Sequence, residues 1–213
     1  QWWETAAHRA LANNSVSYTE RPDIETFMRE WTALVESKSG ERGIFNREAS
    51  KKQAAKFGRR DPDFEFGTNP CSEIILRPYQ FCNLTEVVVR ATDTVDDLER
   101  KVKLATILGT IQSSFTKFPY LRKVWQRNTE EERLLGVSLT GIMDNKLLTT
   151  KNKGLEKTLD HLRQVAVHTN NDYANRLGIP QSTSITCVKP SGTVSQLVDS
   201  ASGIHARHSR YYV

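Results

Sequence analysis

The sequence lacks the features that mark membrane-spanning and disulfide-stapled proteins. It contains no run of 18 apolar residues and no signal-peptide pattern, so neither a spanning helix nor export is indicated. Only three cysteines occur in 213 residues, too few for a disulfide framework. We therefore expect a cytoplasmic protein with reduced thiols and no membrane partner.

Long basic runs with interleaved aromatic residues are also missing. The net charge of +5 and the isoelectric point of about 9.1 are compatible with anionic substrates but do not require nucleic acid. The five histidines form no ligand pattern, and His205 and His208 lie among arginines that indicate a surface. We expect neither direct nucleic-acid binding nor a metal site built from these side chains.

Apolar periodicity predicts strands that alternate with long helices. Residues 94–116 carry a helical apolar stripe, and Thr94 with Asp97 resembles a capping box. A second helix is predicted over 154–177, and residues 86–89 read as a strand. This alternation indicates an α/β protein. No repeat or internal boundary divides residues 1–213, and both ends read as if cut from a longer chain.

The stretch "GTNPCSEI", residues 67–74, gathers three reactive groups of different chemistry. Asn69, Cys71 and Glu73 are spaced i, i+2 and i+4. Side chains alternate in an extended segment, so all three are expected on one side. The pattern predicts a thiol with an amide and a base beside it.

A second cysteine, Cys82, follows Cys71 by 11 residues. The apolar, proline-containing segment between them could fold back as a hairpin-like loop and bring the two thiols together. The spacing does not fit a C-x-x-C zinc knuckle. A redox-active pair and two unrelated buried thiols are both compatible with it, and the unrelated thiols are the default.

The stretch "TSITCVKPSGTVSQL", residues 183–197, predicts a strand, a glycine-containing turn and a short helix, with the turn at "KPSGTVS", residues 189–195. Backbone N–H groups at such a corner favour an anion, and its hydroxyls could add further hydrogen bonds. The spacing is not that of a Walker loop. An ordinary strand–turn–helix corner remains the alternative.

These motifs together resemble the catalytic subunit of ribonucleotide reductases. "NPCSEI…FCNLTEV" and "VKPSGTVSQL…SGIH" carry the resemblance, and "RALANNSV", "GERGIFNREASKK" and "LLGVSLTGIMD" fit it in the same order. The 11-residue gap between the cysteines favours the adenosylcobalamin-dependent (class II) branch, especially its monomeric ribonucleoside-triphosphate reductases.

The resemblance implies part of a ten-stranded α/β barrel with a central finger loop that carries "NPCSEI" at its tip. Cys71 would carry a transient thiyl radical, Glu73 would act as general base, and Asn69 would bind the sugar hydroxyls. Cys82 would be one of two thiols that end as a disulfide. The substrate phosphates would be held by six residues: Pro190, Ser191, Gly192, Thr193, Val194 and Ser195.

The implied cofactor is adenosylcobalamin, and the implied partners are a ribonucleoside tri- or diphosphate and a thioredoxin-like reductant. The family's other redox cysteine lies upstream of the cysteine loop, whereas the third cysteine here, Cys187, lies downstream. The nucleotide-effector region and the C-terminal cysteines are absent too. We therefore expect a fragment, or one piece of a split reductase whose missing part is a partner. The alternatives are a nucleotide-phosphate-binding module without catalysis and a structural α/β domain with incidental thiols.

Overall fold

The computed structural model describes residues 2–6, 8, 15–38, 43–149 and 153–211. Contacts group the chain into two units, Gln1–Pro78 and Tyr79–Val213, which are described separately below. The expectation of one barrel piece without an internal boundary stays a prediction. Part of "RALANNSV" lies outside the described residues.

The first unit is built from short elements. They are α1 (Trp2–Thr5), β1 (Ser15–Tyr18), α2 (Ile24–Ser37), β2 (Gly43–Asn46), α3 (Arg47–Ala55), β3 (Gly67–Thr68) and β4 (Ile75–Leu76). Strands β1 and β2 pair in parallel, and β3 pairs antiparallel with β4. Helix α2 begins at Ile24 because the carboxylate of Asp23 accepts a hydrogen bond of 2.8 Å from the Thr26 N–H.

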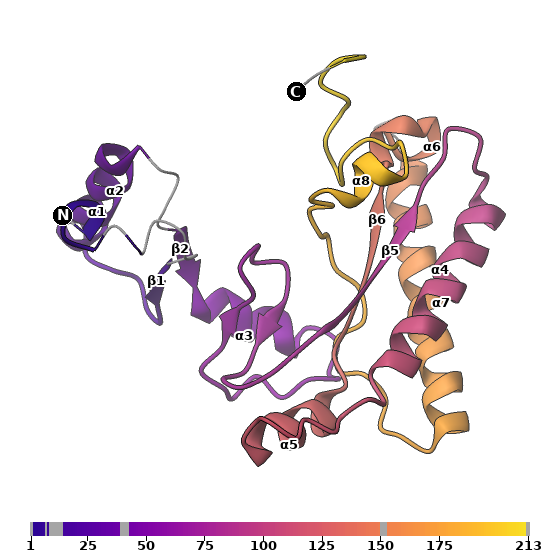
Figure 1. The fold of residues 1–213 in the computed structure, drawn as a ribbon, viewed down its shortest axis with the longest axis horizontal. Coiled ribbons are helices and arrows are strands. Elements are labelled where there is room, and N and C mark those ends of the chain that lie inside the picture. Colours follow the sequence, from indigo (N-terminus) through magenta and orange to yellow (C-terminus); the bar gives the residue numbers. More distant parts are fainter. Residues whose placement is uncertain (1, 7, 9–14, 39–42, 150–152, 212–213) are drawn as a thin grey trace. The chain divides into compact units, whose positions relative to one another are not determined.

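The second unit is a parallel strand pair packed against two long helices. Its elements are β5 (Asn83–Val88), α4 (Val95–Gln112), α5 (Lys123–Glu132), β6 (Leu135–Thr140), the 3₁₀ turn η2 (Ile142–Asp144), α6 (Lys146–Thr149), α7 (Lys153–Leu177) and α8 (Val194–Leu197). The register of β5 on β6 runs from Asn83 opposite Leu135 to Val88 opposite Thr140. Helices α4 and α5 make the crossover that a parallel pair requires. Figure 1 shows α4 and α7 side by side along the strands, which is the predicted mixture of helices and strands.

Apolar side chains from the two strands, the two long helices, α6 and the segment after α7 form the core of the second unit. Its buried members are Val87, Val89, Leu98, Val102, Leu135, Val137, Leu148, Leu162, Ala166 and Ile185. Helix α4 packs tightly on β6 at Gly109, where an added Cβ would lie 3.3 Å from Leu135 Cδ2. A larger residue there would push the helix away from β6.

The segment after α7 lies beside β6 but forms less strand than predicted. The Val137 N–H donates to the Ile185 carbonyl at 2.8 Å, and the Cys187 N–H donates to the Val137 carbonyl at 3.1 Å. Only an isolated parallel bridge, between Val137 and Thr186, results. In the part of the chain that the structure describes, the strands form three two-stranded sheets, so the ten-stranded barrel stays an expectation.

Helix α4 follows the prediction at its start but ends before residue 116. The capping box is confirmed, because the Asp97 N–H donates to Thr94 Oγ1 at 3.2 Å and the Thr94 N–H donates to Asp97 Oδ2 at 3.1 Å. At the other end, the hydroxyls of Ser113 and Ser114 donate to carbonyls of the last turn at 2.7 and 2.6 Å. Serine hydroxyls that bond locally to the backbone compete with continuation of a helix. The helix predicted over 154–177 is confirmed as α7.

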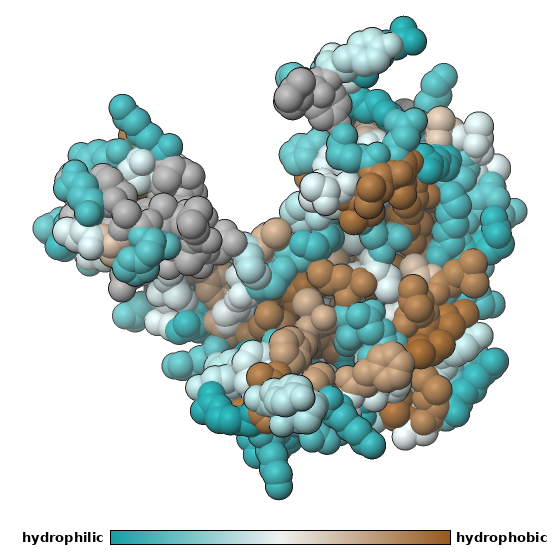
Figure 2. All heavy atoms as spheres, viewed as in Figure 1, coloured by the Kyte–Doolittle hydropathy of each residue, from teal (hydrophilic) through white to brown (hydrophobic). Residues whose placement is uncertain are grey.

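An apolar groove of about 730 Å³ runs between α4 and β5 on the surface of the second unit. One side is made by Leu104, Leu108 and Ile111 of α4 together with Phe115, which follows the helix, and these side chains are 40–71% exposed. Figure 2 shows brown side chains gathered along α4. The stripe predicted on this helix is therefore buried at Leu98 and uncovered toward its C-terminal end.

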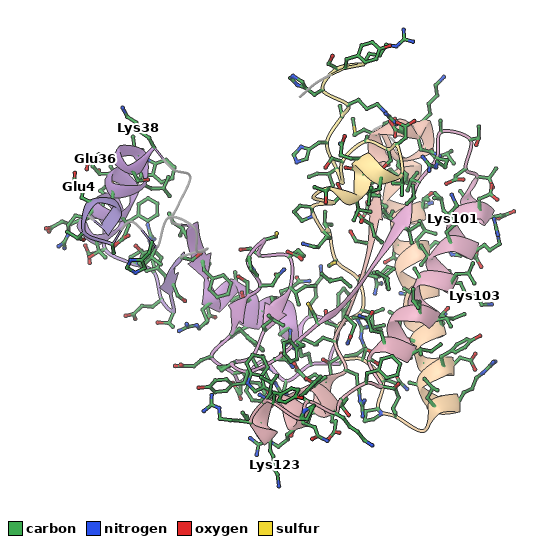
Figure 3. The ribbon with its side chains drawn as sticks, in the orientation of Figure 1. Glu4, Glu36, Lys38, Lys101, Lys103 and Lys123 are labelled. Carbon is green, nitrogen blue, oxygen red and sulfur yellow. The ribbon has the colours of Figure 1, made fainter. Side chains whose placement is uncertain are left out.

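The groove is bounded at its upper end by Lys101, labelled in Figure 3. Its ammonium donates hydrogen bonds to the Val88 carbonyl at 3.0 Å and to Asp93 Oδ2 at 2.6 Å. These bonds tie α4 to the end of β5. Across the described ranges, no helix is both long and apolar enough to cross a membrane.

Candidate active site

The stretch around Cys71 forms the tip of the β3–β4 hairpin. The Asn69 N–H donates to the Ile74 carbonyl at 3.3 Å, and the Ile74 N–H donates back to Asn69 Oδ1 at 3.0 Å. Between them, the Ser72 N–H donates to the Asn69 carbonyl at 3.0 Å and closes a turn. Four residues, from Asn69 to Ser72, therefore reverse the chain and present Cys71 at the surface.

The extended geometry predicted for residues 67–74 is wrong at this tip. Ser72 adopts a φ of 64°, in the left-handed region, so strict alternation of side chains is lost. The turn nevertheless brings two of the three predicted groups together, because Asn69 Nδ2 donates to Glu73 Oε1 at 2.6 Å. A hydrogen bond to an ionised acceptor is short and strong, so it orients the carboxylate.

The base of the hairpin is held by arginines that the sequence motifs did not identify. Arg60 is 6% exposed, and its guanidinium donates to the Ile75 carbonyl at 2.8 Å and lies over the ring of the fully buried Phe66. The Phe66 carbonyl accepts a further bond of 2.9 Å from Arg47 Nε. Both strands of the hairpin are thus anchored to side chains from earlier in the chain.

Cys82 belongs to the second unit, where it is half-buried immediately before β5. The next residue, Asn83, bonds to the Leu134 carbonyl through its backbone N–H at 3.0 Å and through Nδ2 at 3.1 Å. Before Cys82, Phe81 stacks on Trp125 with ring centroids 4.6 Å apart. The position of Cys82 is fixed from both sides, whereas its proposed pairing with another thiol stays a prediction.

Residues 189–195 pass through the predicted turn into the short helix α8, which begins at Val194. The Lys189 N–H donates to Ser138 Oγ on β6 at 2.9 Å, and Gly192 has a φ of 57° with open space where a Cβ would stand. The buried hydroxyl of Ser191 lies 2.7 Å from that of Ser202. Gly192 therefore leaves its backbone accessible, as a close approach by a ligand would require.

One hydroxyl of this turn is buried without a hydrogen-bond partner in the described part of the chain. Ser195 is 1% exposed, and its Oγ makes no hydrogen bond within the described chain. Buried polar atoms are nearly always paired, so this hydroxyl is a candidate to bind a water or a ligand atom.

Two carboxyl groups near this turn have shifted pKa values. Burial raises the pKa of Glu86 on β5, although a hydrogen bond from Thr140 and the charge of Lys189 oppose the shift. Burial acts in the same direction on Asp144 after β6, but hydrogen bonds from Arg207 and Ala201 outweigh it and lower the pKa. Both residues lie within stretches that carry the family resemblance, "FCNLTEV" and "LLGVSLTGIMD", but the sequence does not mark either as a carboxylate that folding will bury.

The two histidines near the C-terminus lie at the surface. His205 and His208 are exposed, as expected. Within the described ranges, no three side chains of the ligating types His, Cys, Asp and Glu are grouped closely enough to hold a metal ion.

Comparisons with known proteins place these motifs in context. No protein-family model matches the chain. The adenosylcobalamin-dependent ribonucleoside-triphosphate reductase of Lactobacillus gasseri is 30% identical over 97% of this chain and 30% of its own length. The enzyme of the same name from Lactobacillus leichmannii is 30% identical over 97% of this chain and 31% of its own length. A probable member from Dictyostelium discoideum is 32% identical over 69% of this chain and 19% of its own length.

A solved structure supports the same relationship. The crystal structure of a B12-dependent (class II) ribonucleotide reductase matches with a TM-score of 0.72 and 26% identity, over 96% of this chain and 32% of that chain. These relatives match nearly the whole of this chain, but the chain spans only about a third of their length.

Proposed function

We propose that this chain is part of an enzyme that reduces ribonucleotides to deoxyribonucleotides by thiyl-radical chemistry. The chain is homologous to a segment of the adenosylcobalamin-dependent ribonucleotide reductases. The observation that carries the proposal is the hairpin tip, where Cys71 stands between Asn69 and Glu73, which are themselves joined by a hydrogen bond of 2.6 Å. The products would serve as DNA precursors.

In this proposal the hairpin tip performs the chemistry on the ribose. Cys71, as a transient thiyl radical, removes the 3′-hydrogen, and Glu73 accepts the proton of the 3′-hydroxyl. Asn69 acts through position: its Oδ1 is held by the Ile74 N–H and its Nδ2 by Glu73, so its amide cannot rotate freely. Groups fixed in this way assist departure of the 2′-hydroxyl as water without further ordering.

Reduction consumes two electrons, which two thiols supply when they join as a disulfide and release two protons. We assign Cys82 as one of these thiols. The second would come from a part of the enzyme outside this chain, because the remaining cysteine, Cys187, lies beside β6 in the segment after α7. A thioredoxin-like dithiol would restore the pair.

The turn at residues 190–195 is proposed to hold the substrate phosphates. Support comes from the exposed backbone at Gly192 and from the unpaired hydroxyl of the buried Ser195. The relatives are named triphosphate reductases, and we extend that substrate class to the complete protein. Backbone N–H groups would bind the phosphate oxygens of either a di- or a triphosphate.

Adenosylcobalamin is proposed as the radical source because the relatives are named for it. A corrin needs a wide cavity with polar contacts at its rim. Two cavities of the second unit, of about 730 and 420 Å³, are lined mostly by aliphatic side chains. These residues do not fit a corrin, so we assign its binding to other parts of the complete protein.

The missing part of the reductase is the proposed partner of the uncovered groove between α4 and β5. Apolar side chains such as Leu108 and Phe115, 61% and 71% exposed, would be covered by a further strand and helix. The alternative is a nucleotide-phosphate-binding piece without catalysis. It would retain the turn at 190–195 and lose turnover.

Replacement of Cys71 by serine in the full-length protein tests the proposed function. A hydroxyl O–H bond is stronger than a thiol S–H bond, so Cys71→Ser should abolish deoxynucleotide formation and leave nucleotide binding intact. Cys187→Ser is the matched control and should retain turnover. Substantial deoxynucleotide formation by Cys71→Ser would refute the radical role.

A further inference from the structure

Residues 199–207 form a strap that crosses the end of β6, and Asp144 is its anchor. The Ala201 N–H donates to Asp144 Oδ2 at 2.7 Å. Arg207 donates two hydrogen bonds to the same carboxylate, from Nε to Oδ1 at 3.0 Å and from Nη2 to Oδ2 at 3.2 Å. The Asp144 side chain is only 17% exposed, so this two-pronged pair is partly shielded from water.

Arg207 also binds Asp199, the first residue of the strap. Its Nη1 donates to Asp199 Oδ1 at 2.8 Å and its Nη2 donates to the Asp199 carbonyl at 3.0 Å. The same carbonyl accepts a bond of 2.8 Å from Arg90 at the end of β5. Asp199 has a φ of 45°, which a residue with a side chain adopts only when its surroundings impose it.

Hydrogen bonds connect this strap to the turn at residues 190–195. The Ser200 N–H donates to the Ser195 carbonyl at 3.0 Å, and the Ser202 hydroxyl lies 2.7 Å from that of Ser191. The Gly203 N–H donates to Thr140 Oγ1 on β6 at 2.9 Å. Both ends of the turn are therefore positioned by the strap rather than by the four-residue helix α8 alone.

We propose that Arg207 is a positioning residue for substrate phosphate: it locks the strap onto Asp144 and so holds the turn at residues 190–195 in its binding geometry. The inference rests on the proposed function, since it assumes that this turn binds phosphate. Arg207 acts through Asp144, Asp199 and Ala201. Its guanidinium engages two carboxylates at once, which a lysine ammonium cannot reproduce with the same geometry.

The test measures substrate affinity and turnover in the full-length protein for Arg207→Gln and Arg207→Lys. We expect Arg207→Gln to raise the Kd for a ribonucleoside triphosphate about tenfold while kcat changes less than about twofold. Arg207→Lys should recover part of the affinity because it keeps the charge. The control is Arg176→Gln, which breaks an exposed ion pair of 2.8 Å with Asp172 on α7 and should change neither quantity.

A double variant checks that Arg207 works through Asp144. Asp144→Asn keeps an oxygen acceptor for the Ala201 N–H but removes the charge that Arg207 grips. If the two residues act as one unit, Asp144→Asn combined with Arg207→Gln should bind no more weakly than the worse single variant. Effects on Kd that multiply independently would overturn the inference.

Hydrogen exchange at the Ala201 amide gives a readout that does not depend on catalysis. Exchange should be faster in Arg207→Gln than in the parent and unchanged in Arg176→Gln, with equal Tm values for all three. Unchanged exchange, or faster exchange with an unchanged Kd, would overturn the proposed positioning. Turnover by Cys71→Ser would instead refute the proposed function, so the two failures are distinguishable.

Discussion

The Asn69 amide donates a hydrogen bond of 2.6 Å to the Glu73 carboxylate across the tip of the β3–β4 hairpin. The same amide accepts the Ile74 N–H through its oxygen. Asn69 thereby connects the backbone of the hairpin to the proposed general base, and Cys71 lies between the two residues in the turn.

The first prediction concerns this connection. In the full-length protein, Glu73→Gln removes the proposed base and should lower kcat by about 10²–10⁴-fold. Asn69→Ala should also lower kcat, because the carboxylate loses its orienting donor. The effects should be less than multiplicative in the double variant, since both substitutions disable one unit.

Thr68→Ala provides the control within the same hairpin. The Thr68 hydroxyl makes only a long contact of 3.4 Å with the Ser72 hydroxyl. Its loss should leave kcat near the parent value. Full activity of Glu73→Gln, or multiplicative effects of the two main substitutions, would contradict the arrangement proposed here.

Local sequence signals predicted the second unit's helices well and the hairpin only in part. The capping pair Thr94 and Asp97 is three residues apart, so the sequence contains the whole interaction. Proximity of Asn69 and Glu73 was expected from strand alternation but arises from a turn with a positive φ at Ser72. A serine carries no signal for that conformation, whereas a glycine would have.

Interactions between distant positions could not be read from the sequence. Arg60 reaches a carbonyl 15 residues away, and Arg207 reaches a carboxylate 63 residues away. The exposed part of α4 is a second feature that the sequence could not resolve. The apolar pattern predicted a buried face correctly at Leu98, but it contains no information on whether the covering element belongs to this chain.

A second prediction uses two glycines with matching backbones. Gly192 and Gly178 have φ values of 57° and 64°, and both have open space at the Cβ position. Alanine at either site should cost a similar 1–2 kcal/mol, on the order expected for left-handed backbone. Only Gly192→Ala should raise the Kd for a ribonucleoside triphosphate, by about tenfold, because its methyl group would block a phosphate. Equal Kd values in a nucleotide titration would refute the role of this turn.

The third prediction follows from the raised pKa of Glu86. Burial makes the folded protein hold this proton more tightly than the unfolded chain does. Folding favours the protonated carboxyl, so the stability that Glu86 contributes is fully present below its ordinary pKa of 4.5. This contribution is lost as pH rises through the raised pKa. Glu86→Gln does not titrate and should therefore raise Tm at pH 7 but not at pH 4.

Thermal unfolding of the parent, Glu86→Gln and the exposed Glu156→Gln over this pH range would check the third prediction. The Tm difference between Glu86→Gln and the parent should grow from pH 4 to pH 7, whereas that of Glu156→Gln should stay small over the whole range. A difference for Glu86→Gln that shrinks as pH rises would show that the carboxylate stabilises the fold.

The last prediction separates Cys82 from the other half-buried thiol of the second unit, Cys187. If Cys82 supplies reducing electrons, the parent protein should lose two thiols for each deoxynucleotide formed in the absence of a reductant. Cys82→Ser should form no such disulfide and should fail in multiple turnover with an external dithiol. Cys187→Ser should behave like the parent in both assays.

The competing explanation is that Cys82 is only a small apolar residue held between Phe81 and Asn83. Serine would then cost some stability through burial of a hydroxyl, and turnover would survive. A thiol count combined with Tm measurements distinguishes the two cases, because a packing defect lowers Tm and leaves the stoichiometry unchanged. Sustained turnover by Cys82→Ser at the parent rate would remove the redox assignment. It would also remove the 11-residue spacing as an argument for the class II branch, and that branch would then rest on the homologous sequences alone.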